Sequence, residues 1–124
     1  MYSHKKPWGC YEVLAEGEGY KVKKITVEPG HRFSYQYHNE RQETWVILDG
    51  EGTVVADGHK FETKPKGKVF FIPRKTKHRA GCSEKSSVPL TFIEVQVGQY
   101  LEEDDIVRLE DDYNRTEESG ETNG

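Results

Sequence analysis

The sequence has no long apolar run. None of its apolar stretches approaches the roughly 18 to 20 residues that a helix needs to cross a bilayer. Its N-terminus, Met-Tyr-Ser-His-Lys-Lys-Pro-Trp, also lacks the apolar core of a signal peptide. We therefore expect a soluble, cytoplasmic chain without a membrane partner.

Cysteine and clustered positive charge are also scarce. The two cysteines, Cys10 and Cys82, lie far apart, and neither has a CxxC or histidine spacing typical of a structural zinc site. We expect both to be free thiols. The 18 Lys and Arg residues form no long cluster and are outnumbered by 22 Asp and Glu residues, which gives a net charge of -4. This composition argues against nucleic acid as a partner.

Hydrophobic residues are few as well. They make up 33% of the 124 residues, which is enough for one domain with a modest core. We place this domain at residues 1–115. From Thr116 onward the chain contains no apolar side chain, so we expect residues 116–124 to form an acidic, disordered tail.

What the sequence does contain is a succession of short β-branched and aromatic runs separated by Gly, Pro and Asp. Such runs predict strands, and their spacing predicts an all-β sandwich or barrel. Asp57-Gly58, between two of the runs, predicts a tight hairpin. The predicted strands cover Tyr20 to Val27, Phe33 to Tyr37, Thr44 to Leu48, Gly52 to Ala56, Lys60 to Thr63, Val69 to Ile72 and Pro89 to Val97.

Four polar side chains are candidate metal ligands. Residues at i and i+2 share a strand face, so Gln36 and His38 point the same way. Glu43 follows after a short turn, and His78 comes just after a strand and a proline-containing turn. One amide oxygen, two imidazoles and one carboxylate suit a divalent cation such as zinc, manganese, iron, cobalt or nickel. The spacing alone equally allows four ordinary polar groups on solvated surfaces.

The spacing of glycines and polar residues resembles the two cupin motifs, with Gln where most cupins have the first His. The first motif comprises Gly30, Gln36, His38, Glu43 and Gly50, and the second comprises Gly67, Pro73 and His78. Longer segments resemble the type II mannose-6-phosphate isomerase domain, which is often fused behind a mannose-1-phosphate guanylyltransferase. These segments are PWG at 7–9, YKVKKITVEPG at 20–30, SYQYHNERQETWVILDG at 34–50, FIPRKTKHR at 71–79 and IEVQVGQYLEEDDIVRLEDDYNR at 93–115.

The resemblance covers about residues 6–115 and implies a single-domain cupin, a jelly-roll barrel that is commonly a homodimer. It implies a divalent metal, zinc before the others. Its ligands would be Gln36, His38, Glu43 and His78, since a Gln at the first position is characteristic of phosphomannose isomerase sites. The implied activity is the interconversion of mannose 6-phosphate and fructose 6-phosphate for nucleotide-sugar and polysaccharide synthesis.

Some residues depart from the family pattern. Asn39, Glu40 and Thr44 stand where relatives often have His. Lys75 replaces the usual Gly of the second motif, and Cys82 replaces its Asn. None of these changes removes a ligand, but they leave the sugar preference open.

The implied isomerisation needs a base near C1 and C2 of the sugar. Glu94 is the predicted base, because it alternates with Gln96 on one face of a strand and an apolar barrel wall would raise its pKa. We predict that Gln96 contacts the substrate. The opposite parity would leave both side chains on the outside.

The phosphate calls for cationic side chains. Arg41 and Arg79 are predicted to bind it, Arg41 first, because both lie close to predicted ligands in sequence. Lys23 shares a strand face with Ile25 and Val27, an unexpected place for an ammonium unless it points into a polar pocket, and we place it with Glu94 among the catalytic candidates. Solvated surface cations are the alternative for all three.

The acidic segment at residues 101–113 resembles the recurring closing segment of the family. Read alone, it is a solvated charged run. The resemblance implies instead that Asp104, Asp105 and Arg108 fasten it across the barrel.

Two other functions stay open. One is a metal cupin that acts on another small molecule as an epimerase or dioxygenase, although a dioxygenase would favour His over Gln as a ligand. The other is a non-catalytic cupin that binds sugar phosphates.

Overall fold

The computed structural model describes residues 2–113, and the regular elements in this range are β-strands only. No helix in the described range is therefore available to cross a membrane. The predicted tail, and residues 114–115 of the predicted domain, lie outside the described residues. The strands are β1 (Tyr2–Lys6), β2 (Gly9–Gly17), β3 (Tyr20–Val27), β4 (Tyr35–Tyr37), β5 (Arg41–Asp49), β6 (Gly52–Ala56), β7 (His59–Glu62), β8 (Val69–Ile72), β9 (His78–Cys82), β10 (Leu90–Gly98) and β11 (Val107–Glu110).

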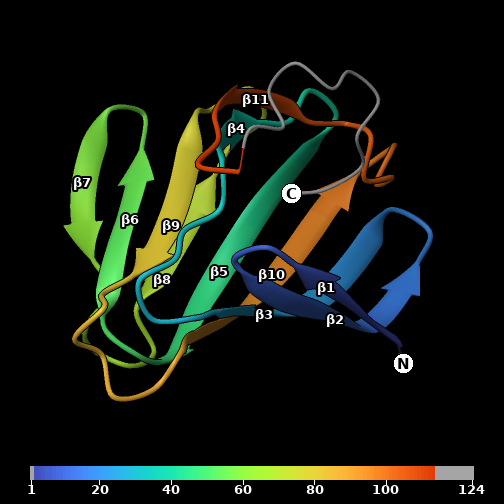
Figure 1. The fold of residues 1–124 in the computed structure, drawn as a ribbon. Coiled ribbons are helices and arrows are strands. Elements are labelled where there is room, and N and C mark those ends of the chain that lie inside the picture. The colour runs from blue at the N-terminus through green and yellow to red at the C-terminus, as the bar shows by residue number, and fades with distance from the viewer. Residues whose placement is uncertain (1, 114–124) are drawn as a thin grey trace.

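The strands form two antiparallel sheets with the core between them (Figure 1). The order in the six-stranded sheet is β1-β2-β3-β10-β5-β8, and the order in the five-stranded sheet is β11-β4-β9-β6-β7. β10 inserts between β3 and β5 although it is distant from both in sequence, and β11 pairs with β4. The all-β prediction is confirmed.

All seven predicted segments overlap a strand of the structure. The predicted hairpin is also confirmed: Ala56 pairs with His59, and Asp57 and Gly58 have positive φ angles of 51° and 78°. Positive φ at both central positions is the geometry of a type I′ turn. Strands β1, β2, β9 and β11 have no counterpart among the predicted segments, because charged and small residues interrupt their apolar alternation.

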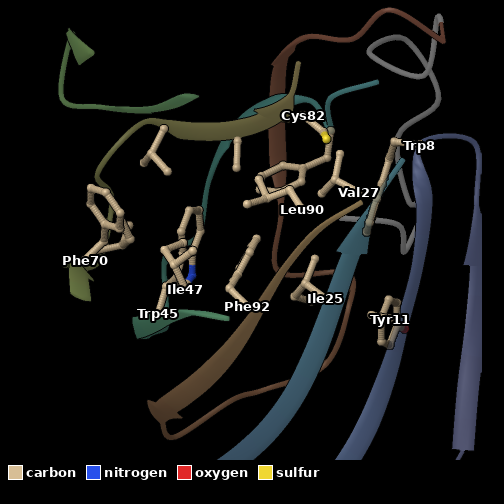
Figure 2. Packing of buried hydrophobic residues seen from close by; sticks show 14 of the residues in the cluster. Trp8, Tyr11, Ile25, Val27, Trp45, Ile47, Phe70, Cys82, Leu90 and Phe92 are labelled. Carbon is tan, nitrogen blue, oxygen red and sulfur yellow. The ribbon is translucent and has the colours of Figure 1, made fainter. Parts of the chain in front are cut away.

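The buried hydrophobic residues pack against one another in a single cluster (Figure 2). Trp45 and Phe92 are fully buried and stack with ring centroids 4.6 Å apart. Phe33 meets Trp45 edge to face at 6.0 Å, and Trp8 meets Phe33 in the same way at 5.5 Å. Truncating Trp45 or Phe92 to Ala would leave a cavity and cost about 3–5 kcal/mol.

The inward faces of three neighbouring strands change from apolar to polar along their length. Because β3, β10 and β5 pair side by side, their polar ends meet at the same mouth of the barrel. This gradient places ionisable side chains next to the core. From the apolar end to the polar end, the inward residues are Val27, Ile25, Lys23 and Lys21 on β3, Leu90, Phe92, Glu94 and Gln96 on β10, and Ile47, Trp45, Glu43 and Arg41 on β5.

Candidate metal centre

The four predicted ligands meet at the polar end of the barrel. Gln36 lies on β4, His38 directly after it, Glu43 on β5 and His78 at the start of β9. Gln36 and His78 lie opposite each other where β4 pairs with β9. All four side chains are buried, with no more than 4% of any one exposed. The structure therefore brings together the residues that the sequence predicts as ligands.

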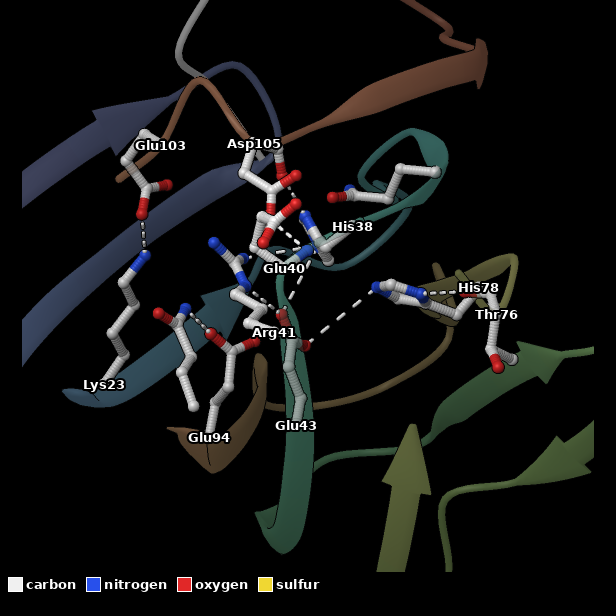
Figure 3. A network of polar contacts seen from close by, with 12 residues as sticks. Lys23, His38, Glu40, Arg41, Glu43, Thr76, His78, Glu94, Glu103 and Asp105 are labelled. Carbon is white, nitrogen blue, oxygen red and sulfur yellow. Dashed lines mark hydrogen bonds and ion pairs between the residues drawn. The ribbon is translucent and has the colours of Figure 1, made fainter. Parts of the chain in front are cut away.

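The donor atoms of His38, Glu43 and His78 face one another (Figure 3). One ligand atom from each lies within 4.8 Å of the other two. Nε2 of His38 is 3.4 Å from Oε2 of Glu43, and Nε2 of His78 is 4.0 Å from Oε1. A transition metal with bonds of about 2.0–2.2 Å fits between donors at such separations. This buried group could therefore hold a metal ion.

Backbone carbonyls orient both imidazoles. Nδ1 of His38 lies 2.6 Å from the carbonyl oxygen of Asp105, and Nδ1 of His78 lies 2.8 Å from that of Thr76. A carbonyl oxygen only accepts hydrogen bonds, so each Nδ1 carries the proton and each Nε2 turns its lone pair toward the space that a cation would occupy beside Glu43. Such second hydrogen bonds are typical of histidines that bind metals.

Gln36 adds an amide to the same cavity. Its Nε2 donates to the carbonyl oxygen of Ser34 at 3.1 Å and to the Ser34 hydroxyl at 3.2 Å. These bonds fix the nitrogen end of the amide. The oxygen end is the one that could bind a cation.

Two side chains of β5 hold the Glu43 carboxylate. Nε of Arg41 donates to Oε2 at 2.8 Å, and Nε1 of Trp45 donates to Oε1 at 2.9 Å. Nη2 of Arg41 also donates to Nε2 of His38 at 3.3 Å. A cation bound to these two atoms would replace both Arg41 hydrogen bonds. Nη1 of Arg41 is buried without a hydrogen-bond partner among the described residues, so the guanidinium has donor capacity for a substrate oxygen.

Burial and charge set the protonation states of the ligands. Burial, together with the charge of Arg41, lowers the pKa of His38 to about 3, and burial lowers the pKa of His78. Burial alone would raise the pKa of Glu43, but the positive charges that face it, that of Arg41 first, hold that pKa well below its usual range. At neutral pH the group therefore has two neutral imidazoles and one carboxylate, the forms in which these residues bind metals.

Glu94 and Gln96 point inward, so the predicted parity of their strand is confirmed. Nε2 of Gln96 donates to Oε2 of Glu94 at 2.6 Å. Burial, followed by the charge of Glu43, raises the pKa of Glu94 to about 8. A carboxyl group with a near-neutral pKa beside a metal group is suited to proton transfer. The roles of both residues stay predictions, and Gln96, unlike Glu94, is not among the residues that line the cavity.

Lys23 also points into the polar end, opposite Glu94 on the neighbouring strand. Its side chain is 3% exposed, and its Nζ lies 2.6 Å from Oε2 of Glu103 and 4.0 Å from the centre of the Tyr11 ring. Glu103 is absent from the predicted site. It belongs to the acidic segment, whose charge density suggests a solvated run and gives no signal for an inward contact.

These side chains line one narrow cavity, whose volume accessible to water is about 30 Å³. Arg41 lies within it, as predicted, and Arg79 does not. Nε of Arg79 donates to the carbonyl oxygen of Phe33 at 3.0 Å, and its guanidinium reaches Glu110. Arg79 follows His78 on β9, and successive residues of a strand point to opposite faces. The structure therefore places Arg79 away from the predicted substrate contacts. Besides the four predicted ligands, the lining comprises Trp8, Tyr11, Lys23, Ile25, Phe33, Arg41, Trp45, Glu94 and Glu103.

The acidic segment fastens onto the site through Asp105. Its carboxylate accepts hydrogen bonds from the backbone N–H groups of Asn39 and Glu40, both at 2.9 Å, while its carbonyl holds His38. Of the three residues predicted to fasten this segment across the barrel, Asp105 is confirmed and Arg108 lies on β11, which pairs with β4, whereas Asp104 accepts a hydrogen bond from the nearby Tyr100 hydroxyl. Because Asn39 and Glu40 are bound through their backbone, their departure from the family pattern leaves these contacts intact.

Lys75, which replaces the usual glycine of the second motif, keeps a backbone conformation that favours glycine. Its φ angle is 63°, in the left-handed region that favours glycine, and its N–H donates to the carbonyl oxygen of His38 at 2.7 Å. The turn thus keeps the conformation that a glycine would adopt. Cys82 is buried, and both it and Cys10 are free thiols, as predicted.

A family model described as mannose-6-phosphate isomerase C-terminal matches residues 2–111. The chain belongs to this family. It is 44% identical over 113 residues to the mannose-1-phosphate guanylyltransferase ManC of Salmonella typhimurium, covering 89% of this chain and 22% of that protein. It is 42% identical over 113 residues to the alginate biosynthesis protein AlgA of Pseudomonas aeruginosa, covering 91% and 23%. The chain thus spans less than a quarter of the length of these relatives.

Solved structures confirm the cupin fold. A cupin protein from Bacteroides fragilis is 25% identical, has a TM-score of 0.59 and matches 66% of this chain and 68% of its own. A protein from Planctomyces limnophilus is 20% identical, has a TM-score of 0.68 and matches 86% of this chain and 88% of its own. The predicted fold and family are therefore both confirmed.

Proposed function

We propose that this chain is a metal-dependent aldose–ketose isomerase that interconverts mannose 6-phosphate and fructose 6-phosphate. One observation carries the proposal: a buried His-Glu-His group with an adjacent amide shares its cavity with a carboxyl group of raised pKa. The family description supports the choice of substrate. The relatives named for polysaccharide biosynthesis support a role in supplying sugar nucleotides, and we expect that role in the cytoplasm.

The reaction moves a proton between C1 and C2 through an enediol. Glu94 would take the proton from one carbon and return it to the other. A pKa near neutrality suits both halves of this transfer, because the same group acts first as base and then as acid. Gln96 holds the carboxyl group in place through its hydrogen bond to Oε2.

Negative charge develops on the sugar oxygens during this transfer. A divalent metal, zinc before manganese, cobalt, nickel or iron, would act there as a Lewis acid when held by Gln36, His38, Glu43 and His78. Nη1 of Arg41, which is buried, would donate to one of these oxygens, a role that differs from the phosphate contact predicted from the sequence. The apolar wall beside the site would exclude water from the enediol.

The activity is tested by assaying fructose 6-phosphate formation from mannose 6-phosphate with and without a chelator. We expect turnover that the chelator abolishes and an added divalent metal restores. Absence of turnover with every divalent metal would overturn the proposal and favour a non-catalytic sugar-phosphate-binding cupin.

The ligand set is tested separately by metal analysis of a double variant, Gln36→Ala with His78→Ala. We expect it to lose most of its metal. The matched control replaces the same residue types at exposed positions, Gln99→Ala with His59→Ala, and should keep its metal. Unchanged metal content in the first variant would show that other residues bind the metal.

A further inference from the structure

A second, basic cavity adjoins the candidate metal cavity. The two share Tyr11, Lys23 and Glu103 in their walls. The second cavity is also lined by Lys6 and Lys21, so three lysines surround it. The part-buried ion pair between Lys23 and Glu103 thus stands between the candidate metal ligands and a cavity lined by three lysines and two glutamates.

This ion pair lies beside the proposed reaction centre. Lys23 on β3 is opposite Glu94 on β10, and side chains in directly opposed strand positions are neighbours. In a hexose 6-phosphate, a carbon chain separates the reacting C1 and C2 atoms from the phosphate. A sugar held with those carbons at Glu94 would extend its phosphate past Lys23 into the basic cavity.

In the structure the Glu103 carboxylate occupies the position beside Lys23 that this phosphate would take. Oε2 of Glu103 lies 2.6 Å from the Lys23 ammonium, a distance typical of a strong charge-assisted hydrogen bond. Lys23 is 3% exposed and Glu103 17%, so Glu103 is the partner on the solvent side. A carboxylate and a phosphate monoester are both oxyanions that bind ammonium groups at such distances.

The segment that carries Glu103 is fastened on both sides of it. On one side, the Leu101 carbonyl accepts from Nζ of Lys21 at 3.2 Å, and on the other, Asp105 binds two backbone N–H groups. The Glu103 side chain could therefore turn outward while its backbone stays attached. Release of its carboxylate would leave three lysines facing one remaining carboxylate, that of Glu102.

We propose that Glu103 occupies the phosphate subsite of the free protein and is displaced by the phosphate of the substrate. The identity of the sugar in this inference rests on the proposed function, whereas the anion subsite rests on the two cavities and the ion pair. A phosphate monoester carries a charge of about -1.5 to -2 at neutral pH and three acceptor oxygens, so it can engage Lys23 together with Lys21 or Lys6. A neutral sugar cannot displace the carboxylate, and this selects phosphorylated sugars.

The test uses Glu103→Gln, which removes the competing charge and keeps the shape of the side chain. Inorganic phosphate is titrated by calorimetry into the full chain in chelator, so that no metal contributes to binding. Because this variant has no ion pair between Lys23 and residue 103 to break, we expect it to bind phosphate about tenfold more tightly than the unmodified chain does. The matched control, Asp104→Asn, changes the charge equally on a neighbouring exposed residue that lines neither cavity, and it should leave phosphate affinity unchanged.

A second variant identifies the cation. Adding Lys23→Met to Glu103→Gln should abolish the gain in phosphate affinity. Equal or weaker binding by Glu103→Gln than by the unmodified chain would overturn the proposal, and so would an equal gain from Asp104→Asn. Thermal unfolding of each variant in chelator verifies that it is folded.

Kinetics separate this inference from the proposed function. In the metal-loaded enzyme we expect Glu103→Gln to lower KM for mannose 6-phosphate with little change in kcat. If no variant converts any sugar but the phosphate affinities change as expected, the isomerase proposal fails and the anion subsite stands. If turnover is present but Glu103→Gln leaves both KM and phosphate affinity unchanged, the subsite proposal fails alone.

Discussion

Glu94→Gln should make the stability of the metal-free protein less dependent on pH. Burial beside Glu43 raises the pKa of Glu94 from an ordinary 4.5 to about 8. Between these values the folded chain holds a proton that the unfolded chain has released, so raising the pH favours unfolding. The glutamine has the shape of the carboxyl group but cannot ionise.

The size of the effect follows from the same two pKa values. Each pH unit in the window costs the folded protein up to about 1.4 kcal/mol from this one group, and the whole window costs on the order of 5 kcal/mol. The loss begins as the pH rises above the unfolded value and is complete above the folded value. Relative to the unmodified protein, Glu94→Gln should therefore gain stability steadily from about pH 5 to pH 8.

The assay is denaturant unfolding at several pH values in chelator, because a bound cation would lower the pKa of a nearby carboxyl group. Glu12→Gln, at an exposed position on β2, is the control and should follow the unmodified protein at every pH. A constant difference in unfolding free energy between Glu94→Gln and the unmodified protein across this range would refute the reasoning. It would mean that Glu94 has an ordinary pKa in the folded protein.

Two further predictions concern packing. Trp45→Phe removes the hydrogen-bond donor to Oε1 of Glu43 and should lower the free energy of unfolding by about 1–3 kcal/mol in denaturant. Calorimetry should also show weaker metal binding. An unchanged metal affinity would show that this hydrogen bond does not orient the ligand. The homodimer implied by the family should use the outer face of the six-stranded sheet. On that face Val69 and Phe71 are 59% and 56% exposed, and the outward side chains of β5, β8 and β10 are uncharged. Phe71→Lys should then sediment as a monomer, and a dimer at the same concentration would exclude this face.

Much of the fold could be predicted because β-branched and aromatic runs between Gly, Pro and Asp identify strands. β3, β6 and β8 match their predicted limits for this reason. β9 does not show that pattern, since His-Arg-Ala-Gly-Cys is polar or small at most positions, yet it pairs with both β4 and β6. Its conformation depends on its neighbours in the sheet, which the local sequence does not contain.

The candidate ligands and Glu94 could be predicted from strand parity together with the family motifs. Strand parity also explains where Arg79 lies. It follows His78 directly in the sequence, so its side chain points to the opposite face of β9. Glu103 could not be predicted, because its contact with Lys23 spans 80 residues and depends on how the segment after β10 crosses the barrel mouth.

The two buried carboxyl groups of the cavity have opposite electrostatic settings, and the order of side chains on the strands explains the difference. Arg41 lies two residues before Glu43 on the same inward face, so its guanidinium reaches that carboxylate and keeps it ionised. Burial, followed by the charge of Glu43, opposes the ionisation of Glu94 on the neighbouring strand and outweighs the hydrogen bond from Gln96, which favours the ionised form. A permanently charged carboxylate suits a metal ligand, and one with a near-neutral pKa suits proton transfer. Exchanging the two environments would remove both capacities, so the inward position of Arg41 and the burial of Glu94 matter as much to the proposed chemistry as the two glutamates.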